Sequence, residues 1–87
     1  SAKCIYEAMN HSLPIICTDQ SGSIVHNNVN GFIINAGDTI ELKKALVFYF
    51  LNKKQIRIMG RKSKKIISKY SWQNYSENVL QNYLTNN

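Results

Sequence analysis

The sequence predicts a small α/β domain, and the arrangement of its apolar residues carries this prediction. Short, continuously apolar segments at residues 13–17 and 32–34 are typical of strands covered on both faces of a parallel sheet. Around them lie longer segments in which apolar residues recur every three or four positions, which indicates amphipathic helices. The chain has 87 residues, of which 44% are hydrophobic, enough to form the core of one small domain. A large multidomain enzyme is therefore excluded for these residues.

The first half of the chain has the order helix, turn, strand. Residues 2–10 carry one apolar stripe and predict a helix, and residues 10–12 interrupt it before the strand at 13–17. A short apolar contact at residues 24–25 precedes the second strand at 32–34. Two or three strands cannot form a covered parallel sheet, because its faces and edges must be paired. We therefore expect residues 1–87 to be one partial domain, cut from a larger one.

The second half is predicted to hold three helices. Asp38 with Glu41 three positions later forms a capping box, which predicts a helix over Thr39–Leu51. A second helix follows, and Gly60 inside it costs about 1 kcal/mol relative to Ala. Ser71 is expected to cap a last helix, because apolar residues again recur every three or four positions after it. The apolar residues of this last helix are Trp72, Tyr75, Val79 and Tyr83.

Charge and composition limit the partners. Eleven Lys and Arg against five Asp and Glu give a net charge of +6, which favours phosphates, anionic lipid or nucleic acid. Most of the basic residues lie at positions 53–69, where a solvated helix face and a membrane-surface role both remain open. Nucleic acid is disfavoured, because no aromatic residues alternate with these charges to stack on bases. No apolar run approaches the roughly 20 residues that cross a bilayer. Two cysteines without a framework spacing favour the reducing cytoplasm, at the inner membrane surface if the basic helix binds lipid.

Several segments resemble one enzyme family in the right order. Residues 7–16, EAMNHSLPII, resemble the E-A-M-A-x-G-x-P-V-I signature of the retaining glycosyltransferases of group 1 (family 4), which have the GT-B fold. Residues 29–34 followed by Gly37 and Asp38 resemble that family's "vnGflv..gD" segment. Further similarities are Leu42, Ala45 and Leu46 to "La.Al", residues 54–60 to "..lr..mG", and residues 70–72 to "ySW".

The resemblance implies the C-terminal half of a Rossmann-like GT-B domain, which holds a nucleotide-sugar donor while a separate N-terminal domain holds the glycan or glycolipid acceptor. It implies that Glu7 accepts hydrogen bonds from the donor ribose hydroxyls, a role suited to an acceptor-only carboxylate. Backbone N–H groups of Ser1, Ala2 and Lys3 would contact the diphosphate, as a helix N-terminus can. The family's first glutamate lies outside these residues, so no catalytic residue is assigned and the chain alone is expected to be inactive. It also implies no metal and no bound cofactor, a role in polysaccharide biosynthesis, and a last helix that folds back across the domain cleft.

The residues also permit simpler interpretations. Glu7 and Lys3 are compatible with a solvated helix surface, and His11 and His26 with ordinary polar turns. Cys4 and Cys17 lack the paired spacing of zinc ligands, and packing explains them. The alternative function is a non-catalytic basic binding module or truncated relic that associates with anionic surfaces or another protein. An unpaired sheet edge is expected to favour self-association.

Overall fold

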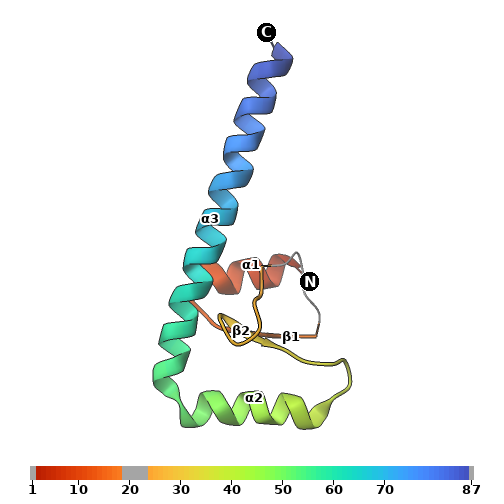
Figure 1. Cartoon of the computed structure of the whole chain (residues 1–87), viewed down its shortest axis with the longest axis vertical. Helices are drawn as coiled ribbons and strands as arrows, with labels where there is room; N and C mark the ends of the chain where they lie inside the picture. The colour runs from red at the N-terminus through yellow and green to blue at the C-terminus, as the bar shows by residue number, and fades with distance from the viewer. Residues whose placement is uncertain (1, 19–23, 87) are drawn as a thin grey trace.

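The computed structural model describes residues 2–18 and 24–86. Two parallel strands lie between helices, and the last helix extends far beyond the rest of the molecule (Figure 1). The long dimension of the chain is 55 Å, against 27 Å and 17 Å for the other two. The elements in order are α1 (Ala2–Asn10), β1 (Ile15–Cys17), β2 (Gly31–Ile33), α2 (Thr39–Leu51) and α3 (Lys53–Asn86).

Helix α1 ends in a tight turn that reverses the chain into β1. The Ser12 N–H donates to the Met9 carbonyl at 3.0 Å and the Leu13 N–H donates to the Ala8 carbonyl at 3.1 Å. This pair of bonds is the Schellman motif, which places one residue in the left-handed conformation. Ser12 is that residue, with φ of 59°. A side chain in this conformation costs about 1–2 kcal/mol, which glycine avoids.

The two strands pair in parallel, and the predicted α/β class is confirmed at this level. Ile15 lies opposite Gly31, and Cys17 lies opposite Ile33. Gly31 is required by packing, because a Cβ atom at this position would overlap the carbonyl of Ile15. Both strands lie where apolar segments predict them, but each has only three residues.

Helix α2 has the predicted bounds and the predicted N-cap residue, but only one of the two bonds of the predicted capping box, because the Asp38 N–H donates to the Asn35 carbonyl at 3.0 Å and not to Glu41. The Asp38 side chain accepts a hydrogen bond from the Glu41 N–H at 3.0 Å. Gly37 precedes the cap with φ of +80°, a conformation that favours glycine. Asn52 separates α2 from α3, and its side-chain amide donates to the Phe48 carbonyl at 2.9 Å.

The core lies where α1, β1 and the first half of α3 meet. Its buried apolar residues come from four separate parts of the chain, and the Tyr6 and Tyr70 rings extend it with centroids 5.6 Å apart. Gly60 permits the close approach of α3, because a Cβ atom there would overlap the Ser12 carbonyl. The buried members of the core are Met9, Ile15, Ile24, Val25 and Ile67.

A buried polar pair fixes the loop before β2 to α3. The Asn30 amide donates to the Ile24 carbonyl at 3.2 Å and to the Ser63 hydroxyl at 3.3 Å. The Asn30 side-chain oxygen accepts from the His26 N–H at 2.8 Å. Ser63 donates in turn to the Asn30 carbonyl at 3.3 Å. Both side chains are fully buried, so these bonds replace water that the groups have lost.

The predicted helix boundary at Ser71 is wrong. Residues 53–86 form one continuous helix of 34 residues, so two helices follow the strands instead of three. Serine fits a helix interior as well as a cap, and no Gly or Pro after Gly60 breaks the helix. None of the helices in residues 2–18 and 24–86 has an apolar stretch long enough to cross a membrane.

Candidate functional site

The start of α1 and the carboxyl ends of both strands lie at one edge of the molecule. Helix α1 precedes β1 through a tight reversal, so the N-terminus of α1 lies at the carboxyl end of β1. Since the strands are parallel, the carboxyl end of β2 lies at the same edge (Figure 1). Ligands of open α/β sheets bind at the carboxyl ends of the strands. This edge, formed by the start of α1 and the ends of β1 and β2, is called the carboxyl edge below.

Glu7 lies in the second turn of α1 and is exposed. Lys3, four residues earlier, is exposed on the same side of the helix, because residues four apart are neighbours on a helix surface. Among the described residues, the Glu7 carboxylate has no hydrogen-bond or ion-pair partner. Its face is opposite Met9, which is fully buried against the core. A carboxylate in this position is available to hydroxyl groups of a ligand.

The structure describes only some of the residues that are predicted to bind the diphosphate. Ala2 is the first residue of α1, and the backbone N–H groups of the first turn have no partner within the helix. Lys3 follows in the same turn, whereas Ser1 lies outside the described residues. Residues 19–23 also lie outside the described residues.

The histidines and cysteines do not converge. No group of three or more His, Cys, Asp or Glu side chains that could hold a metal ion occurs within residues 2–18 and 24–86. His11 follows α1 and His26 precedes β2, and both are exposed. Cys17 is half-buried beside the core, but Cys4 is exposed, so the interpretation of Cys4 as a packing residue is wrong.

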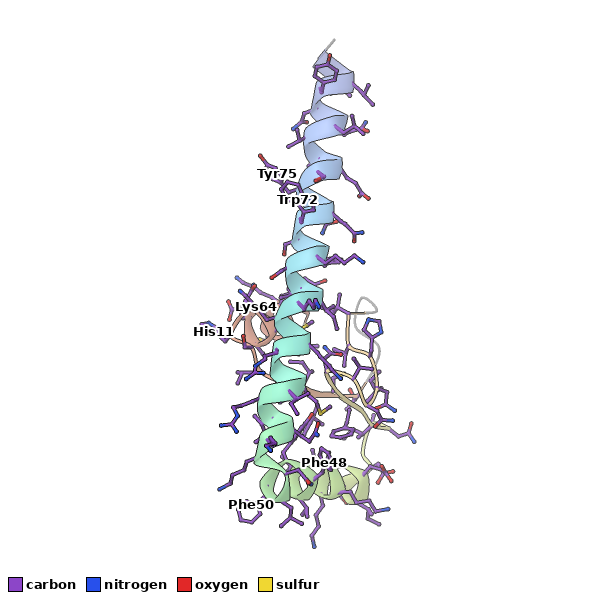
Figure 2. All side chains as sticks on the ribbon, turned by 60° about the vertical axis from the view of Figure 1, so that its left-hand side comes forward. His11, Phe48, Phe50, Lys64, Trp72 and Tyr75 are labelled. Carbon is purple, nitrogen blue, oxygen red and sulfur yellow. The ribbon has the colours of Figure 1, made fainter. Side chains whose placement is uncertain are left out.

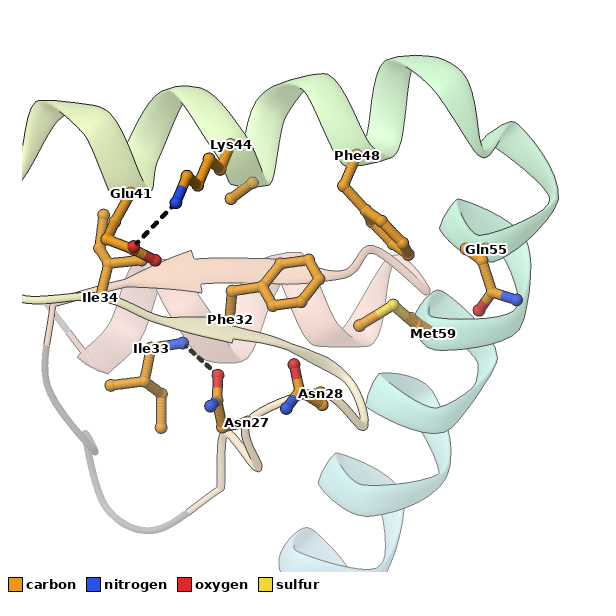
Figure 3. Close-up of a pocket in the computed structure, with 11 residues that line it drawn as sticks. Asn27, Asn28, Phe32, Ile33, Ile34, Glu41, Lys44, Phe48, Gln55 and Met59 are labelled. Carbon is orange, nitrogen blue, oxygen red and sulfur yellow. Dashed lines mark hydrogen bonds and ion pairs between the residues drawn. The ribbon is translucent and has the colours of Figure 1, made fainter.

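A cavity of about 470 Å³ lies between β2, α2 and the start of α3 (Figure 3). Its wall includes the Phe32 and Phe48 rings, whose centroids are 5.3 Å apart and whose planes are nearly perpendicular. Neither Glu7 nor Lys3 contributes to it. The lining residues are Asn27, Asn28, Phe32, Ile33, Ile34, Glu41, Lys44, Ala45, Phe48, Gln55 and Met59.

Several polar groups of this cavity are already paired with other groups of the chain. The Asn27 side-chain oxygen already accepts the Ile33 N–H at 2.9 Å, and Glu41 and Lys44 face each other at 3.8 Å. The ion pair is exposed and therefore weak. Sequence reasoning missed this cavity, because its lining comes from a turn, a strand and two helices. No motif connects these segments.

The structure gives physical reasons for three glycines of the family-like segments. Gly31 and Gly60 allow backbone contacts that a side chain would block, and Gly37 has a positive φ. These requirements belong to the fold, so they do not by themselves identify an activity. No family model, no curated protein and no solved structure matches this chain.

Proposed function

We propose that this chain is the donor-binding C-terminal part of a retaining glycosyltransferase, with a Rossmann-like GT-B half-domain. The observation that supports this function best is the carboxyl edge. It brings the start of α1 to the ends of two parallel strands, with the exposed carboxylate of Glu7 one turn further along the helix. A nucleotide-sugar donor needs N–H donors for its diphosphate and, beside them, a hydrogen-bond acceptor for its ribose hydroxyls.

Each group has a distinct role in this proposal. The backbone N–H groups of Ser1, Ala2 and Lys3 bind the diphosphate, whose negative charge the positive end of the helix dipole favours. Glu7 accepts hydrogen bonds from both ribose hydroxyls, which are stronger than neutral ones because the acceptor is charged. The same helix end would stabilise the charge that develops on the leaving diphosphate during transfer.

The acceptor lies outside this chain in the proposed enzyme. A separate N-terminal domain would hold a glycan or glycolipid, and the family's first glutamate, upstream of Ser1, would contact the transferred sugar. The function is cytoplasmic and needs neither a metal nor a bound cofactor. Polysaccharide or glycolipid synthesis is the process that such a transfer serves.

A titration followed by nuclear magnetic resonance tests the donor site. The ¹⁵N-labelled chain is titrated with UDP-, GDP- and ADP-sugars. One of these donors is expected to shift the amide signals of Ala2, Lys3 and Glu7 in a saturable way. Glu7→Gln should weaken this binding by about 1–3 kcal/mol, the range for a hydrogen bond to a charged group.

Glu77→Gln is the matched control, because it removes an exposed carboxylate from a helix far from the carboxyl edge. It should leave donor binding unchanged. Equal weakening by both substitutions would contradict the ribose role of Glu7. Shifts centred on Phe32 and Phe48 would place the donor in the cavity beside α2 and overturn the proposed site.

A further inference from the structure

Helix α3 has one face, called the outer face below, on which equivalent helical positions carry different kinds of residue in the two halves of the helix. In its first half the positions are basic, and in its second half they are apolar. Each apolar position lies eighteen residues after a basic one, which is five full turns at about 3.6 residues per turn. All eight residues therefore form one line along the helix. The pairs are Lys54 and Trp72, Arg57 and Tyr75, Arg61 and Val79, and Lys65 and Tyr83.

The outer face points away from the folded part of the molecule. The residues of α3 that are buried against the core, Met59, Ser63 and Ile67, recur every four positions on one side of the helix. Arg61 lies two residues after Met59, which is about 200° around the helix. The basic and apolar residues of the outer face are all exposed, and Trp72 and Tyr75 retain 67% and 62% of their accessible surface.

Helix α3 extends away from the folded part of the chain, and its packing across a domain cleft, which the family resemblance implies, stays a prediction because that packing involves a separate domain. Trp72 and Tyr75 stack on each other with centroids 5.9 Å apart, but α3 does not fold back over the rest of the described chain. Figure 2 shows both rings on the part of α3 that extends beyond the folded body, above Lys64. Val79 and Tyr83 continue the exposed line toward the C-terminus.

Helix α3 carries many more positive than negative side chains. The helix carries eight Lys and Arg residues and one carboxylate, Glu77. Glu77 lies five residues after Trp72, about 140° around the helix and away from the line of the outer face. The eight positions of the outer face are therefore all cationic in the first half and all apolar or aromatic in the second half, with Ser68 between the two halves and Ser76 beside Trp72. From Lys54 to Tyr83 it extends about 44 Å at 1.5 Å per residue.

We propose that the outer face of α3 binds an anionic lipid bilayer. Lipid phosphates supply the negative charge that the basic half needs, and the headgroup layer is where Trp and Tyr side chains concentrate. A bilayer is also flat and long enough to contact both halves at once. This function goes beyond donor binding and does not depend on it.

Other partners fit the two halves less well. A single-stranded nucleic acid would need aromatic residues interleaved with the cations, and here they are separated along the helix. A duplex would contact the cations through its phosphates but would leave the aromatic half without a partner. A second copy of the chain could cover the aromatic half, but it would leave the cations without counter-charge. Of these three partners, a surface that is anionic and has an apolar layer complements the whole line.

Vesicle binding can be measured without a label, because Trp72 is the single tryptophan. The 87-residue chain is titrated with phosphatidylcholine vesicles and with vesicles that also contain phosphatidylglycerol. A saturable blue shift of Trp72 emission is expected with the anionic vesicles only. Flotation of the same samples measures the bound fraction. No shift with anionic vesicles would overturn the proposal.

Two double substitutions distinguish binding through the outer face from binding through the total net charge. Arg61→Gln with Lys65→Gln should weaken binding about 30-fold, since each cation near an anionic surface contributes about fivefold. Lys43→Gln with Lys44→Gln removes the same charge from exposed positions of α2 and should weaken binding less than fivefold. Equal weakening by both pairs would show that net charge, not this face, drives binding.

Two single substitutions, each of which adds one carboxylate, test the apolar half of the outer face. Val79→Asp places a carboxylate in the middle of the outer face and should abolish the Trp72 shift. Asn78→Asp adds the same charge at a neighbouring exposed position, about 120° away from Trp72, and should retain the shift. Loss of the shift in both variants would overturn the apolar contact. A concentration-dependent blue shift without lipid, together with dimers in sedimentation, would assign the face to a second copy.

Discussion

Replacing Gly60 by alanine separates local helix propensity from tertiary packing, because the two predict opposite signs. Alanine stabilises a helix interior by about 1 kcal/mol relative to glycine. In the folded chain, however, the new Cβ atom would overlap the Ser12 carbonyl. That carbonyl belongs to the turn closed by two hydrogen bonds between α1 and β1, so it cannot move without disturbing the turn.

The cost of this overlap is set by what must shift. Inserting a methyl group into a packed contact costs about 1–3 kcal/mol, and a rigid backbone neighbour favours the upper part of that range. Retreat of α3 would also lengthen the hydrogen bonds between Ser63 and Asn30. After the gain in propensity, we expect a net loss of about 1–2 kcal/mol in the free energy of unfolding. For a domain of this size the melting temperature should fall by about 4–16 °C.

Urea unfolding followed by circular dichroism measures this difference, with Ser68→Ala as the control. Ser68 is exposed on the same helix, so alanine there changes propensity alone and should stabilise the chain by a few tenths of a kcal/mol, about 0.5 at most. A Gly60→Ala chain that is more stable than the unmodified chain would refute the close contact of α3 with the Ser12 turn.

Three further predictions concern two buried side chains and the proposed sugar transfer. Ser63→Ala should destabilise the chain by about 1–2 kcal/mol in urea, because it removes both hydrogen bonds to Asn30; an unchanged midpoint would contradict this. Burial raises the pKa of Tyr49 to about 12, so the folded chain holds this proton more tightly than the unfolded chain and should lose stability as the pH rises from 10 to 12. Tyr49→Phe should reduce that loss in melting experiments, and an identical pH profile would refute it. The 87-residue chain should transfer no sugar from any donor in a radiolabel assay, and measurable transfer would contradict the proposed division between a donor domain and a separate acceptor domain.

The sequence predicted the helix and strands whose positions depend on interactions between residues close together in the chain. The Asp38 cap needs only the backbone N–H three residues later, and α2 begins and ends where the sequence predicts. Apolar segments likewise located both strands, although pairing with a single neighbour keeps each strand at three residues. The left-handed turn after α1 occurs with Ser12 in place of glycine, since the two hydrogen bonds of the Schellman motif fix the path.

Features that depend on distant contacts were not predictable. Propensity assigns Gly60 a cost, and only the folded structure shows the carbonyl that requires a glycine there. Ser71 is favoured at an N-cap but is tolerated in a helix interior, so its role depends on whether another element turns the chain at that point. The cavity beside Phe32 and Phe48 forms only when β2, α2 and α3 meet, and no single segment signals it.

The two proposed sites use different surfaces, so they can be occupied together and tested independently. Helix α1 packs on the buried side of α3 through Met9 and Ile67, whereas the outer face of α3 lies opposite. A donor at Glu7 would therefore not cover Arg61 or Lys65. Glu7→Gln should leave the Trp72 shift with anionic vesicles unchanged, and Arg61→Gln with Lys65→Gln should leave donor-induced shifts at Ala2–Asn10 unchanged. Cross-effects in both directions would mean that the substitutions loosen the packing of α1 on α3, and neither assignment would then be supported by its variant.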